Sequence, residues 1–240
     1  KDCILFYRLG DFYEMFFDDA IVVSKELELT LTGKSCGAEE RAPMCGVPYH
    51  AVEGYLNKLV ANGHKVAICE QVEDPKLAKG LVKREVIRIV TPGTNTDMQA
   101  LDESKNNYIM CIVYLADKYG ISLADISTGD YFVTEVDTER KLIDEINKFA
   151  PSEIICNESF YMSGVDLSDM KNRLGIAVYS LEAWYFSDET AENTLKEHFK
   201  VQSLEGLGLS DYACGTIAAG ALLRYLYETQ KNDLGNLSAI

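Results

Sequence analysis

The sequence predicts a mixed α/β protein made of two domains, and three features of the chain carry this prediction. Segments with the apolar pattern of strands are interleaved with segments in which apolar residues recur at helical spacing. A polar stretch without periodicity divides the chain, so we place one domain at residues 1–97, a linker at 98–107 and a second domain at 108–240. The length of 240 residues is enough for one large or two ordinary domains.

Composition indicates a folded protein without a membrane anchor. Hydrophobic residues make up 47% of the chain and charged residues 25%. No apolar run reaches the ~18 residues needed to cross a bilayer, and no basic and then apolar stretch marks a signal peptide. No two of the seven cysteines form a Cys-x-x-Cys pair, and most lie in apolar contexts, so we expect reduced thiols of a cytoplasmic protein and neither a disulfide framework nor a zinc site.

Charge is unevenly distributed along the chain. The net charge is −15, which by itself argues against binding to nucleic acid. Residues 1–97 carry 12 basic and 15 acidic residues, a net charge of −3, whereas residues 98–240 carry 11 and 23, a net charge of −12. Any contact with DNA should therefore belong to the first domain, because the second should repel phosphate.

The first domain opens with a predicted strand that turns into a helix. Ile4 to Leu9 is apolar enough for a buried strand, and Gly10 ends it. Asp11 then stands where an N-cap residue would accept from the first turn of a helix, with Glu14 three residues later as in a capping box. The apolar positions of this expected helix are Phe12, Phe16, Ala20, Val23 and Leu27. On this interpretation Phe12 is a core residue and Glu14 is a cap.

The sequence of the rest of the first domain predicts a strand-like pair, a short helix and two further strands. Residues 42–51 contain two prolines and a glycine, so we expect a constrained but irregular backbone there. Val52 to Val60 has the spacing of an amphipathic helix, which Asn62-Gly63 should end. The other expected segments are a strand-like pair at 30–34, a loop at 35–41, a strand at 65–71, a polar loop at 73–83 and a strand at 85–91.

The amino-acid sequences of several segments resemble those of the MutS family of DNA mismatch-repair proteins. Gly10-Asp11-Phe12-Tyr13-Glu14-Met15-Phe16 looks like the signature of that family. Further matches follow in the same order as in the family: Pro43-Met44 with Gly46, Pro48-Tyr49-His50-Ala51, Tyr55-Leu56, residues 66–71, Asp74-Pro75 and residues 88–94. The resemblance is strong over residues 3–94 and weaker over 108–240, where it rests on pattern and on residues 125–129.

The resemblance implies a site for mismatched double-stranded DNA. In the family, the Phe-x-Glu pair touches the mispaired base, so Phe12 would stack on that base from the minor groove and Glu14 would hydrogen-bond to it. Six further residues are expected to lie near DNA: Lys34, Pro43, Met44, His50, Lys76 and Lys79. The implied architecture is a mixed-sheet mismatch-recognition domain followed by an RNase H-like connector domain without nuclease activity.

The sequence of the second domain predicts strands and a helix in the order β-β-β-α-β, which is like that of the ribonuclease H fold. The three strand candidates and their short joints are typical of hairpins. The expected segments are strands at Tyr108 to Ala116, Gly120 to Ile126 and Tyr131 to Val136, a helix at Thr138 to Phe149 stopped by Pro151, and a strand at Glu153 to Cys156. Helical spacing returns at Asp188 to Phe199 and at Tyr212 to Thr229.

Two other classes of function stay open at this level. Asp125 and Asp130 flank a predicted hairpin and could bind magnesium in an RNase H-like nuclease, although acidic residues at turns are commonly just solvated. The acidic second half also fits a protein-interaction module with no role on DNA. Gly206 to Asp211 lacks the third glycine of a dinucleotide fingerprint, and the sequence has no P-loop. None of the three histidines stands at metal-ligand spacing from a cysteine or carboxylate.

The resemblance also implies partners that lie beyond these residues. Members of the family continue into lever, clamp and ATPase domains, so we expect this chain to be the N-terminal part of a longer protein. ATP and magnesium are then expected in that ATPase domain, and no cofactor and no enzymatic activity in the present residues. A MutL-type partner should dock through residues 108–240. We expect the full-length protein to be a dimer in the bacterial cytosol, near the nucleoid, and this chain alone to be a monomer.

Overall fold

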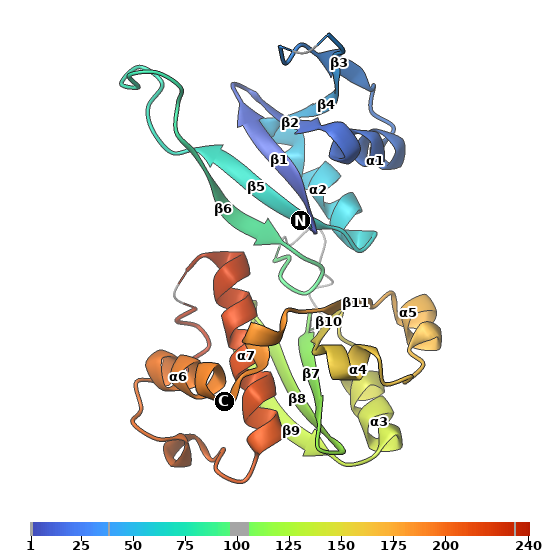
Figure 1. Ribbon diagram of the computed structural model, residues 1–240, viewed down its shortest axis with the longest axis vertical. Helices are drawn as coiled ribbons and strands as arrows, with labels where there is room; N and C mark the ends of the chain where they lie inside the picture. The colour runs from blue at the N-terminus through green and yellow to red at the C-terminus, as the bar shows by residue number, and fades with distance from the viewer. Residues whose placement is uncertain (1, 38, 97–105, 233) are drawn as a thin grey trace. The chain divides into compact units, whose positions relative to one another are not determined.

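The computed structural model (Figure 1) describes residues 2–37, 39–96, 106–232 and 234–240. The chain divides into two compact units, one formed by the residues up to 96 together with 229–231 and the other by residues 106–228, 232 and 234–240. Most of the linker expected at 98–107 lies outside the described residues. In the described part of the chain, no helix combines the length and the apolarity that crossing a membrane requires.

The first unit is a mixed six-stranded sheet with two α-helices. The sheet has the strand order β3-β4-β2-β1-β5-β6, in which only β1 and β5 are parallel neighbours. Its elements are β1 (Cys3–Leu9), β2 (Phe12–Phe16), α1 (Phe17–Leu27), β3 (Thr32–Lys34), β4 (Ala42–Pro48), the 3-10 helix η1 (Tyr49–Ala51), α2 (Val52–Ala61), β5 (Lys65–Gln71) and β6 (Arg84–Val90).

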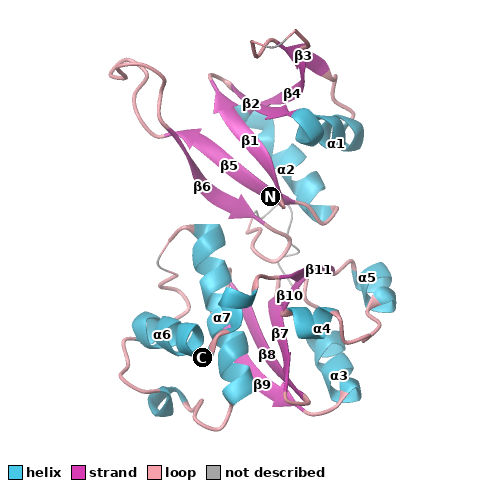
Figure 2. Ribbon diagram, viewed as in Figure 1, coloured by secondary structure: helices cyan, strands magenta, loops and turns pink. Residues whose placement is uncertain are grey.

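Both helices of this unit pack on the same face of the sheet. The core joins alternate strand residues, among them Phe6, Met15 and Val47, to the inner faces of α1 and α2. Figure 2 shows both helices on one side of the strands. Neither α-helix covers the opposite face, and the side chains that alternate with the core residues lie there.

The expected helix start at Asp11 is wrong, because residues 12–16 form β2. Tyr13 and Met15 are buried and Phe12 is exposed, which is the two-residue alternation of a half-buried strand. Glu14 therefore does not cap a helix. The helix begins at Phe17, and its first turn contains Asp18 and Asp19, the acidic residues that favour a helix N-terminus.

Residues 42–51 are also more regular than their prolines indicate. Residues 42–48 form β4, with Cys45 and Val47 buried in the core. Pro48 ends the strand and Pro43 faces the three-residue edge strand β3, so neither proline interrupts a long ladder. The remaining secondary-structure expectations for this unit are confirmed: α2 ends at Ala61 with Asn62 as its C-cap, and β5 and β6 form the two later strands.

The second unit is a five-stranded sheet with helices on both faces. The sheet has the order β11-β10-β7-β8-β9, with β7, β10 and β11 parallel and β8 antiparallel to both of its neighbours. Its elements are β7 (Ile109–Leu115), β8 (Lys118–Asp125), β9 (Asp130–Val136), α3 (Glu139–Phe149), β10 (Glu153–Cys156), α4 (Glu158–Tyr161), α5 (Ser168–Leu174), β11 (Ala177–Ser180), η2 (Ala183–Phe186), α6 (Asp188–Phe199), η3 (Leu204–Leu207) and α7 (Ala213–Gln230).

Burial on both faces explains the continuous apolar run of β7. Ile109 and Cys111 point into a core with α6 and α7, whereas Met110 and Ile112 point into a second core with α3, α4 and α5. Strands that are covered on both faces are apolar at every position. Numbered within this unit, the strand order is 3-2-1-4-5, and this order confirms the expected RNase H-like fold.

Short elements of the second unit were missed in the sequence. These are β11, α4 and α5, which are four to seven residues long and too short for a period to emerge. The longer α3 was predicted from its helical spacing. In the structure Thr138 is its N-cap and accepts from the backbone N–H of Lys141 at 3.2 Å.

None of the seven cysteines is in a disulfide, and five of them are buried. Burial raises the pKa of the Cys45 and Cys214 thiols to about 11 and that of Cys156 to about 12. These three thiols are therefore protonated at neutral pH, and a protonated thiol is a poor nucleophile and a poor metal ligand.

Close contact between α6 and α7 depends on Gly220. A Cβ atom at this position would lie 2.4 Å from the Cα of Ala191. We predict that Gly220→Ala lowers the free energy of unfolding of this unit by about 2–3 kcal/mol, because the two helices must separate. Urea unfolding followed by the fluorescence of Trp184, the single tryptophan, measures this effect.

Gly206→Ala is the matched control, because a Cβ there meets no atom within 4 Å. Its free energy of unfolding should stay within about 0.5 kcal/mol of the original protein. Equal effects of the two substitutions would show that α6 and α7 do not touch at Gly220.

Candidate nucleic-acid interface

An aromatic ring and a carboxylate project side by side from β2 on the uncovered face of the first sheet. Phe12 and Glu14 are two residues apart in a strand, so they point to the same face. Phe12 is 48% exposed, while the Glu14 side chain is only 17% exposed. In this arrangement the ring is available for stacking, and the carboxylate lies deeper beside it.

A two-residue turn places Phe12 at the end of the sheet. Leu9 pairs with Phe12, so Gly10 and Asp11 form the turn of the β1–β2 hairpin. Gly10 has a φ of +58°, which glycine adopts without the steric cost of a Cβ atom. The Phe12 ring therefore stands at the edge of a tight hairpin and not in the middle of the sheet.

The end of this hairpin is fixed to the segment that follows β4. The backbone N–H of Tyr49 donates to the carbonyl of Asp11 at 2.9 Å. The guanidinium of Arg8 lies 3.8 Å from the centre of the Tyr49 ring and 3.5 Å from a carboxylate oxygen of Glu70. The hydroxyl of Tyr13 donates to the same carboxylate. These contacts hold the backbone under Phe12 from the side that faces the core.

Glu14 forms an ion pair with Lys34 of β3. The Nζ atom of Lys34 lies 2.6 Å from Oε2 of Glu14, and the Lys34 side chain is 43% exposed. The same ammonium lies 5.6 Å from the centre of the Phe16 ring, which is close enough for a cation–π contact. Lys34 therefore lies beside the carboxylate on the uncovered face.

A row of aromatic and basic side chains continues from this pair across the face. The rings of Phe16 and Tyr7 meet edge to face at 6.3 Å, and the Arg84 guanidinium lies 5.0 Å from the centre of the Tyr7 ring. Arg84 also donates to the backbone carbonyl of Arg8 at 2.8 Å. Rings interleaved with cations are suited to nucleic acid, because the rings stack and the cations attract phosphate.

The other residues predicted to lie near DNA fall into two groups. Pro43 and Met44 lie on β4, with Met44 opposite Phe16, and they are close to Lys34 in the ladder. His50 is exposed in η1. The second group, Lys76 and Lys79, lies in the exposed loop between β5 and β6. Because β1 and β5 are parallel, this loop and the Phe12 hairpin leave the same end of the sheet.

Sequence reasoning missed Gly46, which borders both residues of the pair. Gly46 lies opposite Glu14 in β4, and a Cβ atom there would sit 3.7 Å from Cγ of Glu14 and 3.9 Å from a ring atom of Phe12. Glycine thus leaves the space between the ring and the carboxylate open. Its place in the Pro-Met-x-Gly segment was visible, but the strand pairing that brings it to Glu14 was not.

Of the two carboxylates of the second unit that were considered for nuclease chemistry, that of Asp125 has a structural role. Asp125 is buried, and its carboxylate accepts from the backbone N–H groups of Asn107 and Ser127 at 3.0 and 2.9 Å and from the Ser127 hydroxyl at 2.6 Å. Asp130 pairs with it across the turn. Among the residues that the structure describes, no three His, Cys, Asp or Glu side chains are grouped to hold a metal ion. This geometry gives the nuclease alternative no support.

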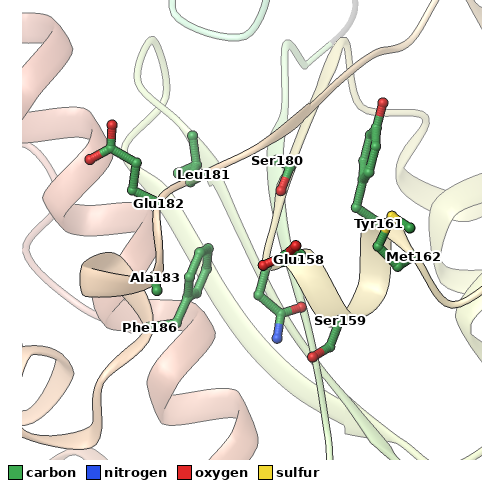
Figure 3. A pocket seen from close by; sticks show the side chains of 10 residues that line it. Glu158, Ser159, Tyr161, Met162, Ser180, Leu181, Glu182, Ala183 and Phe186 are labelled. Atoms are coloured by element: carbon green, nitrogen blue, oxygen red, sulfur yellow. The ribbon is translucent and has the colours of Figure 1, made fainter.

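The second unit has a pocket of about 570 Å³ at the carboxyl ends of β10 and β11 (Figure 3). Its walls are mixed, with the carboxylates of Glu158 and Glu182 beside the apolar side chains of Met162 and Phe186. The Nε1 atom of Trp184 donates to Glu182 at 2.7 Å. Pockets in α/β sheets commonly form at this end of the strands, so the position alone assigns no ligand.

These features together define a two-unit α/β protein in which aromatic and charged side chains lie on one face of the first sheet. Comparison with known proteins gives its family. Residues 1–99 match the family described as MutS domain I, and residues 107–238 match MutS domain II. The chain belongs to the MutS family.

Relatives named "DNA mismatch repair protein MutS" are similar to this chain over nearly its whole length. The chain is 67% identical to that of Lachnoclostridium phytofermentans, over 100% of this chain and 26% of the relative. It is 52% identical to that of Acetivibrio thermocellus, over 99% and 27%, and 51% identical to that of Clostridium tetani, over 99% and 26%. The chain thus spans about a quarter of the length of these curated relatives.

The alternation of buried and exposed side chains along β2 predicts which substitutions lower stability. Met15 is fully buried, so Met15→Ala should lower the free energy of unfolding by about 2–5 kcal/mol. Phe12→Ala should lower it by less than about 1 kcal/mol, because the exposed ring contributes little to the core. Urea unfolding followed by circular dichroism measures both. The reverse order of effects would restore Phe12 as a core residue.

Proposed function

We propose that this chain is the mismatch-reading part of a DNA mismatch-repair protein. The observation that carries the proposal is the pair of Phe12 and Glu14 on the uncovered face of a unit that matches MutS domain I. The names of its relatives support the same activity. The substrate is duplex DNA that contains a mispaired base.

Phe12 acts as a wedge in this proposal. Its exposed ring enters the duplex from the minor groove and stacks on one base of the mispair. Insertion of a ring between base steps costs a few kcal/mol of unstacking and kinks the duplex. A mispair is already weakly stacked, so it is easier to deform than a Watson–Crick pair. Stacking accepts any base, which suits a reader of several kinds of mismatch.

Glu14 supplies the discrimination. A carboxylate beside the base stack lies within a Debye length, ~10 Å, of several phosphates and is repelled by them. This repulsion acts on every duplex. A mispair whose base edge donates a hydrogen bond to Glu14 offsets it, whereas a perfect duplex does not. Glu14 therefore penalises perfect DNA more than mismatched DNA.

The second unit couples this reading to a MutL-type partner. Its residues carry most of the negative charge of the chain, and Asp188, Glu189 and Glu197 are exposed on α6. An acidic surface repels DNA and attracts a basic protein surface. In the full-length protein, this unit would connect the DNA reader to an ATPase domain that binds ATP and magnesium.

Substitutions of the pair test the reading mechanism. Phe12→Ala should weaken binding to a mismatched duplex at least about tenfold, because each stacked base contributes about 1–3 kcal/mol. Glu14→Gln should raise affinity for perfect duplex, so the preference for the mismatch falls. The measurement is a pair of fluorescence titrations, with perfect and mismatched duplex, at low salt because a chain of charge −15 binds DNA weakly at physiological salt.

A thermal melt of each variant separates binding from folding. Both variants should melt within a few degrees of the original chain, because neither side chain is part of the buried core. Unchanged affinities for both duplexes in both variants would refute the reading mechanism.

Charge reversal on α6 tests the role of the second unit. Glu189→Lys with Glu197→Lys should weaken binding to the MutL-type partner about tenfold and leave DNA binding unchanged. Isothermal titration calorimetry measures the first effect and the duplex titration the second. Asp144→Lys with Glu145→Lys on α3 is the matched control. Equal loss in both variants would mean that the partner responds only to overall charge, and no loss on α6 would place the partner elsewhere.

A further inference from the structure

We infer that Lys34 determines how strongly Glu14 discriminates between duplexes, because it is the counterion of the reading carboxylate. This inference rests on the proposed function of Phe12 and Glu14 and assigns a specificity-determining residue to the same site. The interaction that carries it is the 2.6 Å ion pair between Nζ of Lys34 and Oε2 of Glu14.

Lys34 is more exposed to solvent than the carboxylate with which it pairs. The Lys34 side chain is 43% exposed and the Glu14 side chain is 17% exposed, so a duplex that approaches the uncovered face meets the ammonium before the carboxylate. The ring of Phe16 lies 5.6 Å from the ammonium, and a cation–π contact of this kind holds the long side chain over the sheet. Lys34 is thus placed to meet phosphate and carboxylate at the same time.

The open space beside Glu14 would allow a base to approach the carboxylate while Lys34 stays paired with it. Gly46 is directly opposite Glu14, and any side chain there would fill the gap between the carboxylate and the Phe12 ring. The base that stacks on Phe12 would therefore reach Glu14 from one side, while Lys34 contacts Glu14 from the other. The carboxylate need not leave its ion pair to accept a hydrogen bond, because a carboxylate has two oxygens and several acceptor positions.

The charge balance gives Lys34 a defined effect. With the ion pair in place, the ammonium offsets part of the carboxylate charge, so the repulsion of Glu14 by the phosphates is reduced. Without the ammonium, one negative charge faces the backbone of every duplex, and repulsion within a Debye length lowers affinity. A mispair that donates to Glu14 recovers part of this loss, so removal of Lys34 should weaken perfect duplex more than mismatched duplex.

A double-mutant cycle between positions 34 and 14 tests the inference in the 240-residue chain. Lys34→Met keeps an apolar stem over Phe16 and removes the charge. At low salt it should weaken perfect-duplex binding about fivefold when residue 14 is Glu, near the upper end for an exposed ion pair. In the Glu14→Gln background the same change should cost less than about twofold. Lys34→Met should also raise the preference for mismatched duplex about threefold, and Lys34→Arg should retain the original affinities.

Other roles of Lys34 would give different results in the double-mutant cycle. An equal loss in both backgrounds would make Lys34 an independent phosphate contact, and a larger loss in the Glu14→Gln background would mean that Glu14 restrains Lys34 from binding phosphate. Either result overturns the inference. The matched control is Lys25→Met on α1, the helix that covers the other face, and its small effect should be the same in both backgrounds.

The cycle also distinguishes failure of the inference from failure of the proposed function. If Phe12→Ala abolishes the preference for mismatched duplex and the cycle is additive, the reading pair stands and the role of Lys34 falls. If the original chain shows no preference that Phe12→Ala removes, the proposed function fails, and the role of Lys34 fails with it.

Discussion

Burial of Tyr13 and Met15 under the two helices is the constraint on which the candidate site depends. These two side chains enter the core with Phe6 and Val47, and the alternation of the strand then directs Phe12 and Glu14 to the opposite face. A shift of the β2 register by one residue would bury the ring and the carboxylate and expose the core residues. The same packing energy that stabilises the first unit therefore orients Phe12 and Glu14.

A sheet with one uncovered face is suited to contact with a large, flat polyanion. Its exposed face in this unit combines the rings of Phe16 and Tyr7 with the cations of Lys34 and Arg84. The overall charge of the unit is still slightly negative, so long-range attraction to DNA is weak and the contact depends on local arrangement. In the proposed function, this balance would favour recognition of a deformable site over tight binding to every duplex, because a stacking ring acts only where a base step opens.

The second unit differs from the first in how its sheet is covered. Both faces of its sheet are buried by helices, and the carboxylate of Asp125, which was considered as a metal ligand, is hydrogen-bonded to the turn after β8. A unit covered on both faces has little exposed apolar surface apart from edges and loops. Its helical surface is dominated by charged side chains, as on α6, where Glu192 and Lys196 pair at 2.5 Å and other carboxylates stay exposed.

The sequence by itself determined the elements that have a clear local period and a local stop. The strand β7, the helix α3 and the Asn62-Gly63 end of α2 were predicted, because each depends on neighbours within a few residues. The family and the identity of Phe12 and Glu14 as candidate reading residues also came from the order of residues along the chain.

Tertiary structure decided where those side chains point and what they contact. Phe12, Phe16, Ala20 and Val23 satisfy a helical period, while Tyr13 and Met15 satisfy a strand, and only pairing of β2 with β1 and β4 selects the strand. The ion pair of Glu14 with Lys34 and the gap left by Gly46 join segments 20 and 32 residues apart. Such contacts depend on the strand register across the sheet, which no local pattern specifies, because register is set by which face the helices bury.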